Sequence, residues 1–224
     1  MEDVLVLAHG AFHGPWCWQP TLRPLEAAGV RCIAVDLDRG GLEADRAALQ
    51  GVVDDLVDEN CRVHAIGHSL GCSSVARLDP RTLATLTLLA GSAVGPGMPD
   101  PAGITFAGFG ETLIAQSDGR TFLSREDARA IFYHRCSEKT TEAALDRLRP
   151  TFVYGGEETS PPIWDAIPVT YIECLDDRVV QPAFQRATAA QCPYSAALDS
   201  DHSPMLGQPE ALASLVLEAM GRAN

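Results

Sequence analysis

Short apolar runs alternate with longer amphipathic stretches along most of the chain. The apolar runs have the length of buried strands, and the stretches between them carry apolar residues at the spacing of one helix face. The predicted strands cover 4–8, 32–35, 62–66, 83–89, 169–174 and 194–198. The predicted helices cover 21–28, 42–58, 183–190, a short segment that ends near Pro80 and a final segment after Pro209. This alternation predicts an α/β fold with a mostly parallel sheet covered on both faces.

The stretch 42–58 shows the helical pattern most clearly. Its apolar residues fall on one face, which we expect to pack against the sheet. They are Leu49, Val52, Val53, Leu56 and Val57.

The alternation stops between 94 and 162. Residues 95–99 read G-P-G-M-P, which is typical of a break between elements. A helix is predicted from about 124 to 136, with Ser124 as its N-cap and acidic residues in its first turn. We therefore predict a core made of 1–93 and 163–224, with 94–162 inserted as a lid over the carboxyl edge of the sheet. Four phenylalanines in this insertion fit a lid, although ordinary core packing explains them nearly as well: Phe106, Phe109, Phe122 and Phe132.

Composition narrows the class of protein. A chain of 224 residues fits one domain, and a net charge of −13 argues against nucleic acids and anionic membranes as partners. Neither a basic leader nor a membrane-length apolar run is seen, and the seven cysteines are scattered, so we expect reduced thiols in a cytoplasmic protein. The sixteen arginines against one lysine suggest a bacterial source, and Lys139, in a polar stretch, is a poor Schiff-base residue. A small-molecule substrate is expected, with no cofactor and no metal, and the oligomeric state is open.

The most informative motif is Gly67-His68-Ser69-Leu70-Gly71, a G-x-S-x-G sequence. It follows a predicted strand and precedes a predicted helix, which is the context of a nucleophile elbow. The turn is so sharp that glycine is needed two residues on either side of the serine. We therefore predict Ser69 to be a nucleophile.

Two loops after the last predicted strands carry possible partners for Ser69. Where such an elbow supplies the nucleophile, the acid and then the histidine follow in the chain. His202 is the one histidine C-terminal of the insertion and is predicted to be the base. The acid stays open, because Asp176 and Asp177 are adjacent and Asp201 could pair locally with His202.

Four further motifs make the chain resemble the α/β-hydrolase superfamily, and within it the group of hydroxynitrile lyases and plant methylesterases. Residues 9–18 (H-G-A-F-H-G-P-W-C-W) resemble the group's H-G-x-x-H-G-x-W-x-W loop. Residues 171–177 (Y-I-E-C-L-D-D) resemble its Y-I-x-C-x-x-D strand, and 201–206 (D-H-S-P-M-L) its D-H-x-P-x-L loop. Residues 132–136 (F-Y-H-R-C) are similar to a stretch common in bacterial members. The resemblance spans nearly the whole chain.

This resemblance implies an α/β-hydrolase fold and a triad of Ser69, His202 and Asp177. It also implies an oxyanion hole made by the backbone N–H groups of Ala11 and Leu70. Candidate substrate-binding side chains are apolar, which suits a hydrophobic acyl or aryl group of modest size. They are Phe12, Trp164, Phe106, Phe109 and Met205.

The chain departs from the lyases of this group at two positions. Those lyases have threonine after the first histidine of the loop and lysine after the catalytic histidine, where this chain has Gly10 and Ser203. A leaving cyanide would then lack its cationic partner, which argues against hydroxynitrile cleavage. Cys72 also replaces the second glycine of the common G-x-S-x-G-G.

Three functions follow for testing. The first is a serine hydrolase that cleaves a hydrophobic ester or thioester through an acyl-serine. The second is a cofactor-free lyase, cyclase or decarboxylase that transfers protons through His202, since the fold alone does not decide the chemistry. The third is a non-catalytic binder of small molecules, for which an intact serine, histidine and aspartate set would be superfluous.

Overall fold

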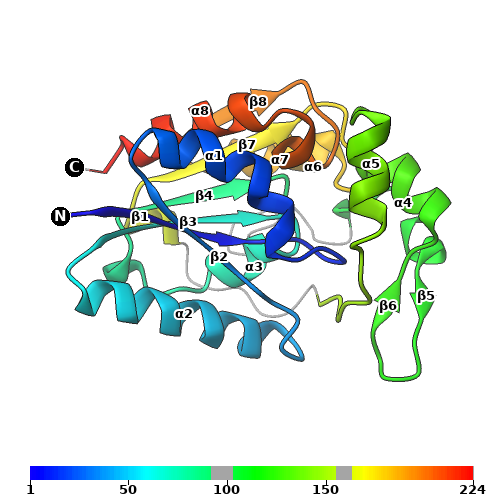
Figure 1. Cartoon of the computed structure of the whole chain (residues 1–224), viewed down its shortest axis with the longest axis horizontal. Coiled ribbons are helices and arrows are strands. Elements are labelled where there is room, and N and C mark those ends of the chain that lie inside the picture. The colour runs from blue at the N-terminus through cyan, green and yellow to red at the C-terminus, as the bar shows by residue number, and fades with distance from the viewer. Residues whose placement is uncertain (92–102, 155–162, 224) are drawn as a thin grey trace.

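The computed structural model describes residues 1–91, 103–154 and 163–223, apart from the side chain of Trp164. Six parallel strands form a central sheet in the order β2-β1-β3-β4-β7-β8 (Figure 1). Their bounds are β1 (Asp3–Ala8), β2 (Arg31–Val35), β3 (Arg62–His68), β4 (Thr85–Leu89), β7 (Val169–Cys174) and β8 (Tyr194–Leu198). The core helices are α1 (Gln19–Ala27), α2 (Leu42–Asp58), α3 (Gly71–Val75), α6 (Pro182–Ala189), α7 (Pro204–Gly207) and α8 (Pro209–Met220). The predicted parallel, doubly covered sheet is confirmed.

The two faces of the sheet follow from alternation along its strands. In β1, Val4, Val6 and Ala8 point into the cluster covered by α2 and α3. Leu5 and Leu7, between them, point into the cluster covered by α1 and α8. Because each strand residue turns to the opposite face from its neighbour, an unbroken apolar run buries side chains on both sides.

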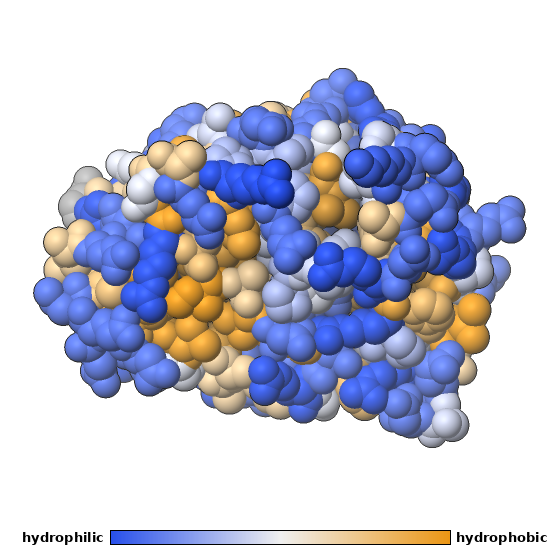
Figure 2. Space-filling view, in the orientation of Figure 1, coloured by the Kyte–Doolittle hydropathy of each residue, from blue (hydrophilic) through white to orange (hydrophobic). Residues whose placement is uncertain are grey.

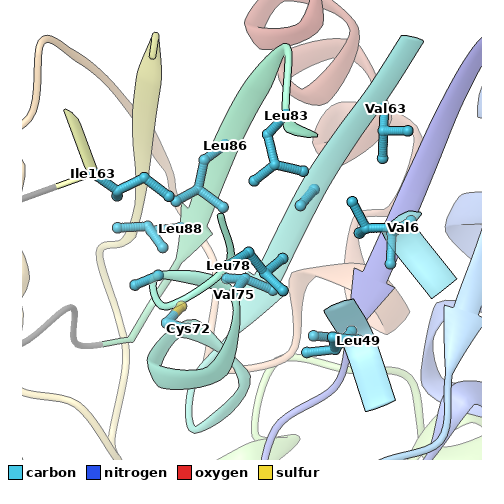
Figure 3. Packing of buried hydrophobic residues seen from close by; sticks show 14 of the residues in the cluster. Val6, Leu49, Val63, Cys72, Val75, Leu78, Leu83, Leu86, Leu88 and Ile163 are labelled. Carbon is cyan, nitrogen blue, oxygen red and sulfur yellow. The ribbon is translucent and has the colours of Figure 1, made fainter. Parts of the chain in front are cut away.

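The cluster under α2 and α3 anchors the segment that follows β3. Figure 3 shows Val6, Leu49, Val75 and Cys72 converging from β1, α2 and α3. Full burial of an aliphatic side chain of this size contributes about 1.5–3 kcal/mol, so α3 is held firmly although it is short.

Helix α2 has the predicted bounds, and Leu49, Val53 and Leu56 are buried as expected. Val57 is different, because 40% of its surface is exposed. Its position lies one residue past the buried stripe, at the boundary of the helix face.

The insertion (here residues 103–154) lies at the end of the sheet where the parallel strands terminate (Figure 1). It holds a small hairpin of β5 (Ile114–Ala115) and β6 (Thr121–Phe122), then α4 (Arg125–Phe132) and α5 (Glu138–Leu145). Ser124 caps α4 as predicted, accepting a hydrogen bond from the N–H of Asp127, but the helix ends at Phe132 rather than near 136. The remainder of the predicted lid, 94–102 and 155–162, lies outside the described residues. Its working as a lid stays a prediction.

Surface polarity differs between regions of the molecule. Figure 2 shows apolar side chains gathered between α1 and α2, where the edge strand β2 runs, while most of this face is polar. None of the described helices has the length and apolar character needed to cross a membrane.

The strand order reverses its direction between the neighbouring strands β1 and β3. The chain goes from β1 outward to β2, then returns past β1 to β3 and continues in the other direction. The loops that leave β1 and β3 therefore diverge to opposite faces, and in open parallel sheets ligands bind in the crevice at this switch point. Both the 9–14 loop and the G-x-S-x-G segment lie at this switch point.

Candidate active site

The G-x-S-x-G segment adopts the geometry of an elbow. Ser69 has φ of +52°, a left-handed conformation that costs an L-residue roughly 1–2 kcal/mol. A Cβ atom on Gly67 would lie 2.8 Å from the backbone of Cys72, and one on Gly71 would lie 2.6 Å from the carbonyl oxygen of His9. Both glycines are therefore required by close approach of backbone, as the sequence predicted.

Hydrogen bonds on both sides hold this strained residue in place. The N–H of Ser69 donates to the carbonyl of Leu89 at 2.9 Å, and its own carbonyl accepts from the N–H of Cys72 at 3.1 Å. The thiol of Cys72 donates to the carbonyl of Gly67 at 3.0 Å. Ser69 itself remains partly exposed, while Gly67 is buried.

His202 and Asp177 meet as a buried pair. Nδ1 of His202 lies 2.7 Å from Oδ2 of Asp177, and both residues are at most 2% exposed. Asp177 also accepts the N–H groups of Val179 and Val180 on Oδ1, and the side-chain amide of Gln185 on Oδ2. A carboxylate that accepts four hydrogen bonds is held in one orientation.

The other two carboxylates that the sequence left open have different partners. Asp176 is exposed and contacts Nε2 of His134 at 3.1 Å. Asp201 is buried but accepts the backbone N–H groups of Ser203 and Arg135 rather than the His202 ring. The geometry therefore favours Asp177 as the partner of His202.

His68 connects the elbow to the His202 loop. Its Nε2 donates to the carbonyl of His202 at 2.8 Å, and the two ring centroids are 4.6 Å apart. Since His68 directly precedes Ser69, this bond places the loop of His202 beside the elbow. Its Nδ1 is buried without a partner among the described residues.

The loop after β1 is held by its two histidines. Nδ1 of His9 donates to the carbonyl of Gly10 at 2.8 Å, and Nδ1 of His13 donates to the carbonyl of Ala11 at 2.7 Å. Between them Phe12 has φ of +65°, and its N–H donates to the hydroxyl of Thr151 at 2.9 Å. The candidate donors Ala11 and Leu70 follow β1 and β3, so they lie at the switch point on neighbouring strands.

Burial favours the neutral form of His9, His13 and His68. Burial lowers the pKa of His13 to about 3, although its bond to the Ala11 carbonyl opposes the shift. The pKa of His68 is also held well below its usual value by burial, assisted by the nearby His202 and His13. Burial lowers the pKa of His9 in the same way. Neutral rings have one donor and one acceptor each, which fixes the direction of their hydrogen bonds.

The predicted substrate-binding residues do not all gather near His202. Phe132 stacks on the ring of His202 at a centroid distance of 5.8 Å, and Phe12 lies 6.1 Å from Phe132. Phe12 and the half-buried Phe109 belong to one apolar cluster with Phe132. Phe106 is 42% exposed. The Trp164 side chain lies outside the described part of the chain.

Met205 lies in the core, and its predicted contact with substrate stays a prediction. It is 0% exposed and packs in the core cluster between the sheet and α8. Helix α7 begins directly after Ser203 and turns the Met205 side chain inward. The backbone carbonyl of Met205 accepts a hydrogen bond from the hydroxyl of Thr21.

Among the described residues, no group of three or more histidine, cysteine, aspartate or glutamate side chains is placed to hold a metal ion. The seven cysteines are all free thiols.

Comparison with known proteins agrees with this geometry. A model of the "Alpha/beta hydrolase family" matches residues 5–215. The chain belongs to the alpha/beta hydrolase family. Its relatives include pheophorbidase from Raphanus sativus, 26% identical over 245 residues that cover 96% of this chain and 93% of the relative. Methylesterase 17 from Arabidopsis thaliana is 24% identical over 251 residues, covering 96% and 90%.

Solved structures show the same fold as this α/β-hydrolase. An Arabidopsis methylesterase superposes with a TM-score of 0.79 at 24% identity, covering 98% of this chain and 99% of the other. Tomato methylketone synthase I, in complex with 2-tridecanone, superposes with a TM-score of 0.83 at 17% identity and full coverage of both chains. The predicted family, fold and enzyme class are confirmed, and several of the relatives carry names of ester hydrolases.

Three residues that hydrogen-bond to side chains or loops of this site were not predicted from the sequence. His68 is only the variable residue of the elbow motif, and Tyr133, whose hydroxyl lies 2.7 Å from Nε2 of His13, is only part of the F-Y-H-R-C stretch. Gln185 carries no motif signal at all, because it lies on α6 and reaches Asp177 only in the folded chain.

Proposed function

We propose that this hydrolase cleaves carboxylic esters through an acyl-enzyme formed on Ser69. The observation that carries the proposal is that two hydrogen bonds fix the position of His202. Its Nδ1 is bonded to Asp177, and its backbone carbonyl accepts from His68, the residue before Ser69. Because Nδ1 carries the proton in that bond, Nε2 keeps the lone pair of the neutral ring. A base oriented in this way is what a serine hydroxyl needs to become nucleophilic.

The reaction would proceed in two halves. Oγ of Ser69 attacks the ester carbonyl while its proton passes to Nε2 of His202, and collapse of the intermediate releases the alcohol with that proton. Water then attacks the acyl-serine, gives its proton to Nε2, and the acid leaves as Ser69 regains its hydrogen. The N–H groups of Ala11 and Leu70 would stabilise the oxyanion in both halves.

The proposed substrate is an ester of a hydrophobic acid of modest size. Phe12 and Phe132 supply aromatic surface beside His202. The relatives named methylesterase make methyl esters the first class to test.

Gly10 supports hydrolysis over cyanohydrin cleavage. A Cβ atom at this position would lie 2.9 Å from both Nδ1 of His68 and Cβ of Ser69. The threonine of the resembling lyases would therefore displace one of these groups in this chain.

The test is turnover of short-chain p-nitrophenyl esters by wild type and Ser69→Ala. We expect the substitution to reduce kcat by about 10⁴-fold or more, since only residual stabilisation remains. Ser214→Ala, at an exposed position of α8, is the matched control and should retain full activity. A fluorophosphonate should phosphonylate wild type with loss of fluoride, adding the mass of the phosphonyl group, and should leave Ser69→Ala unmodified.

Other outcomes would lead to other functions. Wild-type turnover by Ser69→Ala would rule out the acyl-serine, and loss of that turnover in His202→Ala would then indicate proton-transfer chemistry. Stabilisation by a ligand without any turnover would indicate a binding protein.

A further inference from the structure

Tyr133 links the insertion to the loop that follows β1. It directly follows α4, is 1% exposed, and its hydroxyl lies 2.7 Å from Nε2 of His13. Nδ1 of the same ring lies 2.7 Å from the carbonyl oxygen of Ala11. The three groups form a continuous hydrogen-bonded chain from the insertion to the Ala11 backbone.

The direction of this chain is fixed by its last member. A carbonyl can only accept, so Nδ1 of His13 must carry the hydrogen and Nε2 must accept. The hydroxyl of Tyr133 is therefore the donor to Nε2. Burial, which lowers the pKa of His13 to about 3, keeps the ring in this neutral form.

The peptide between Ala11 and Phe12 is thereby held at both of its polar atoms. Its carbonyl accepts from His13, and its N–H donates to the hydroxyl of Thr151 at 2.9 Å. The peptide before it is held by His9, which donates to the Gly10 carbonyl. Because N–H and C=O point in opposite directions across a trans peptide, that bond sets the direction of the Ala11 N–H.

These restraints oppose a conformational cost. Phe12 has φ of +65°, which is unfavourable for a residue with a side chain and persists only where the surroundings over-determine it. Removing one restraint should let the loop relax, and a small displacement of a donor lowers catalysis strongly.

We propose that Tyr133 is a positioning residue, which acts through His13 to hold the Ala11 carbonyl and, together with the His9 bond to the preceding peptide, keeps Ala11 oriented as an oxyanion donor. This inference rests on the proposed function and adds to it a role for the insertion. Tyr133 stabilises the transition state indirectly and has no contact with the reacting atoms.

Tyr133→Phe removes the hydroxyl and little else. We expect kcat to fall by about 10-fold with KM within twofold, since the loop would be misaligned rather than lost. Affinity for a trifluoromethyl ketone, which forms an oxyanion on Ser69, should fall by the same factor as kcat/KM. Affinity for the corresponding alcohol, which forms no oxyanion, should not change.

Tyr154→Phe is the matched control. Tyr154 is half-buried, and its hydroxyl is also hydrogen-bonded, to Asp45 and Ser74, but not to the described loop after β1. It should leave kcat and inhibitor affinity unchanged.

A double-mutant cycle tests whether Tyr133 acts through His13. His13→Leu should lower kcat by at least as much as Tyr133→Phe, and adding Tyr133→Phe to it should lower kcat no further. Losses that multiply in the double mutant would overturn the inference, as would an unchanged kcat and ketone affinity in Tyr133→Phe.

If Tyr133→Phe does not fold, Thr151→Val should lower kcat and ketone affinity together while Thr151→Ser retains both. An unaltered Thr151→Val would overturn the alignment. The proposed function fails separately, by turnover in Ser69→Ala.

Discussion

His13 should make the stability of the protein depend on pH below neutrality. In the folded chain burial lowers its pKa to about 3, against 6.5 for an unperturbed histidine. A pKa that is lower in the folded state means that the unfolded chain binds the proton more readily. The contribution of the neutral ring is therefore complete above pH 6.5 and is lost as the pH falls towards 3.

The size of the effect follows from the separation of the two pKa values. At pH 5, about 1.5 units below the pKa of 6.5, position 13 is protonated in the unfolded chain and neutral in the folded one. At about 1.4 kcal/mol per unit, this lowers the free energy of unfolding by roughly 2 kcal/mol. That is a large fraction of the total stability of a domain, which is about 5–15 kcal/mol.

His13→Asn isolates this effect from those of other titrating groups. Asparagine keeps an N–H near the position of Nδ1 but does not titrate. Urea unfolding at pH 7.5 and pH 5 should show a destabilisation by His13→Asn that shrinks by about 2 kcal/mol at the lower pH, since only wild type gains a proton at position 13 on unfolding. Contributions common to both chains cancel in the difference.

Two results would refute this reasoning. The first is a destabilisation that is equal at the two pH values, which would mean that His13 titrates alike in folded and unfolded chains. The second is loss of the pH effect in 0.5 M NaCl, because salt screens charge pairs but does not alter burial.

Glycine and aspartate positions give two further predictions. Gly51→Ala, in the exposed middle of α2 with open space around it, should raise the free energy of unfolding by about 0.5–1 kcal/mol. Gly71→Ala should lower the free energy of unfolding by about 1–3 kcal/mol, because its Cβ would meet the His9 carbonyl at 2.6 Å. Urea unfolding of both variants measures the two changes, and an undiminished stability of Gly71→Ala would contradict the close approach. Asp177→Asn should reduce ester turnover by about 10⁴-fold through loss of the correct His202 tautomer, and Asp176→Asn should change it less than twofold. The reverse ranking would assign the acid to Asp176.

The sheet was predictable because its strands carry their own signal. β7 and β8 have the predicted bounds, since each is a short apolar or β-prone run bounded by residues that end a strand. The β5–β6 hairpin was missed, because strands of two residues have no periodicity. The four-residue α7 was missed for the same reason.

The residues of the candidate site also differ in how far the sequence predicts them. Ser69 and His202 are marked by motif and by chain order, which reflect the topology of the sheet. Asp177 could not be separated from Asp176 by residue type, because the turn that buries one and exposes the other depends on the N–H groups of Val179 and Val180. Contacts of this kind are made across space and leave no local pattern.

The insertion between β4 and β7 has a consequence for how this enzyme can change. The two strands pair directly, so the sheet closes across whatever lies between them. Loop-closure entropy grows slowly, by about 0.6 kcal/mol for each doubling of length, so segments of other lengths should be grafted here at small thermodynamic cost. A graft must preserve two hydroxyls, those that Tyr133 and Thr151 place against His13 and the Phe12 N–H, so substrate range can diverge in this segment only while these two contacts are inherited or replaced.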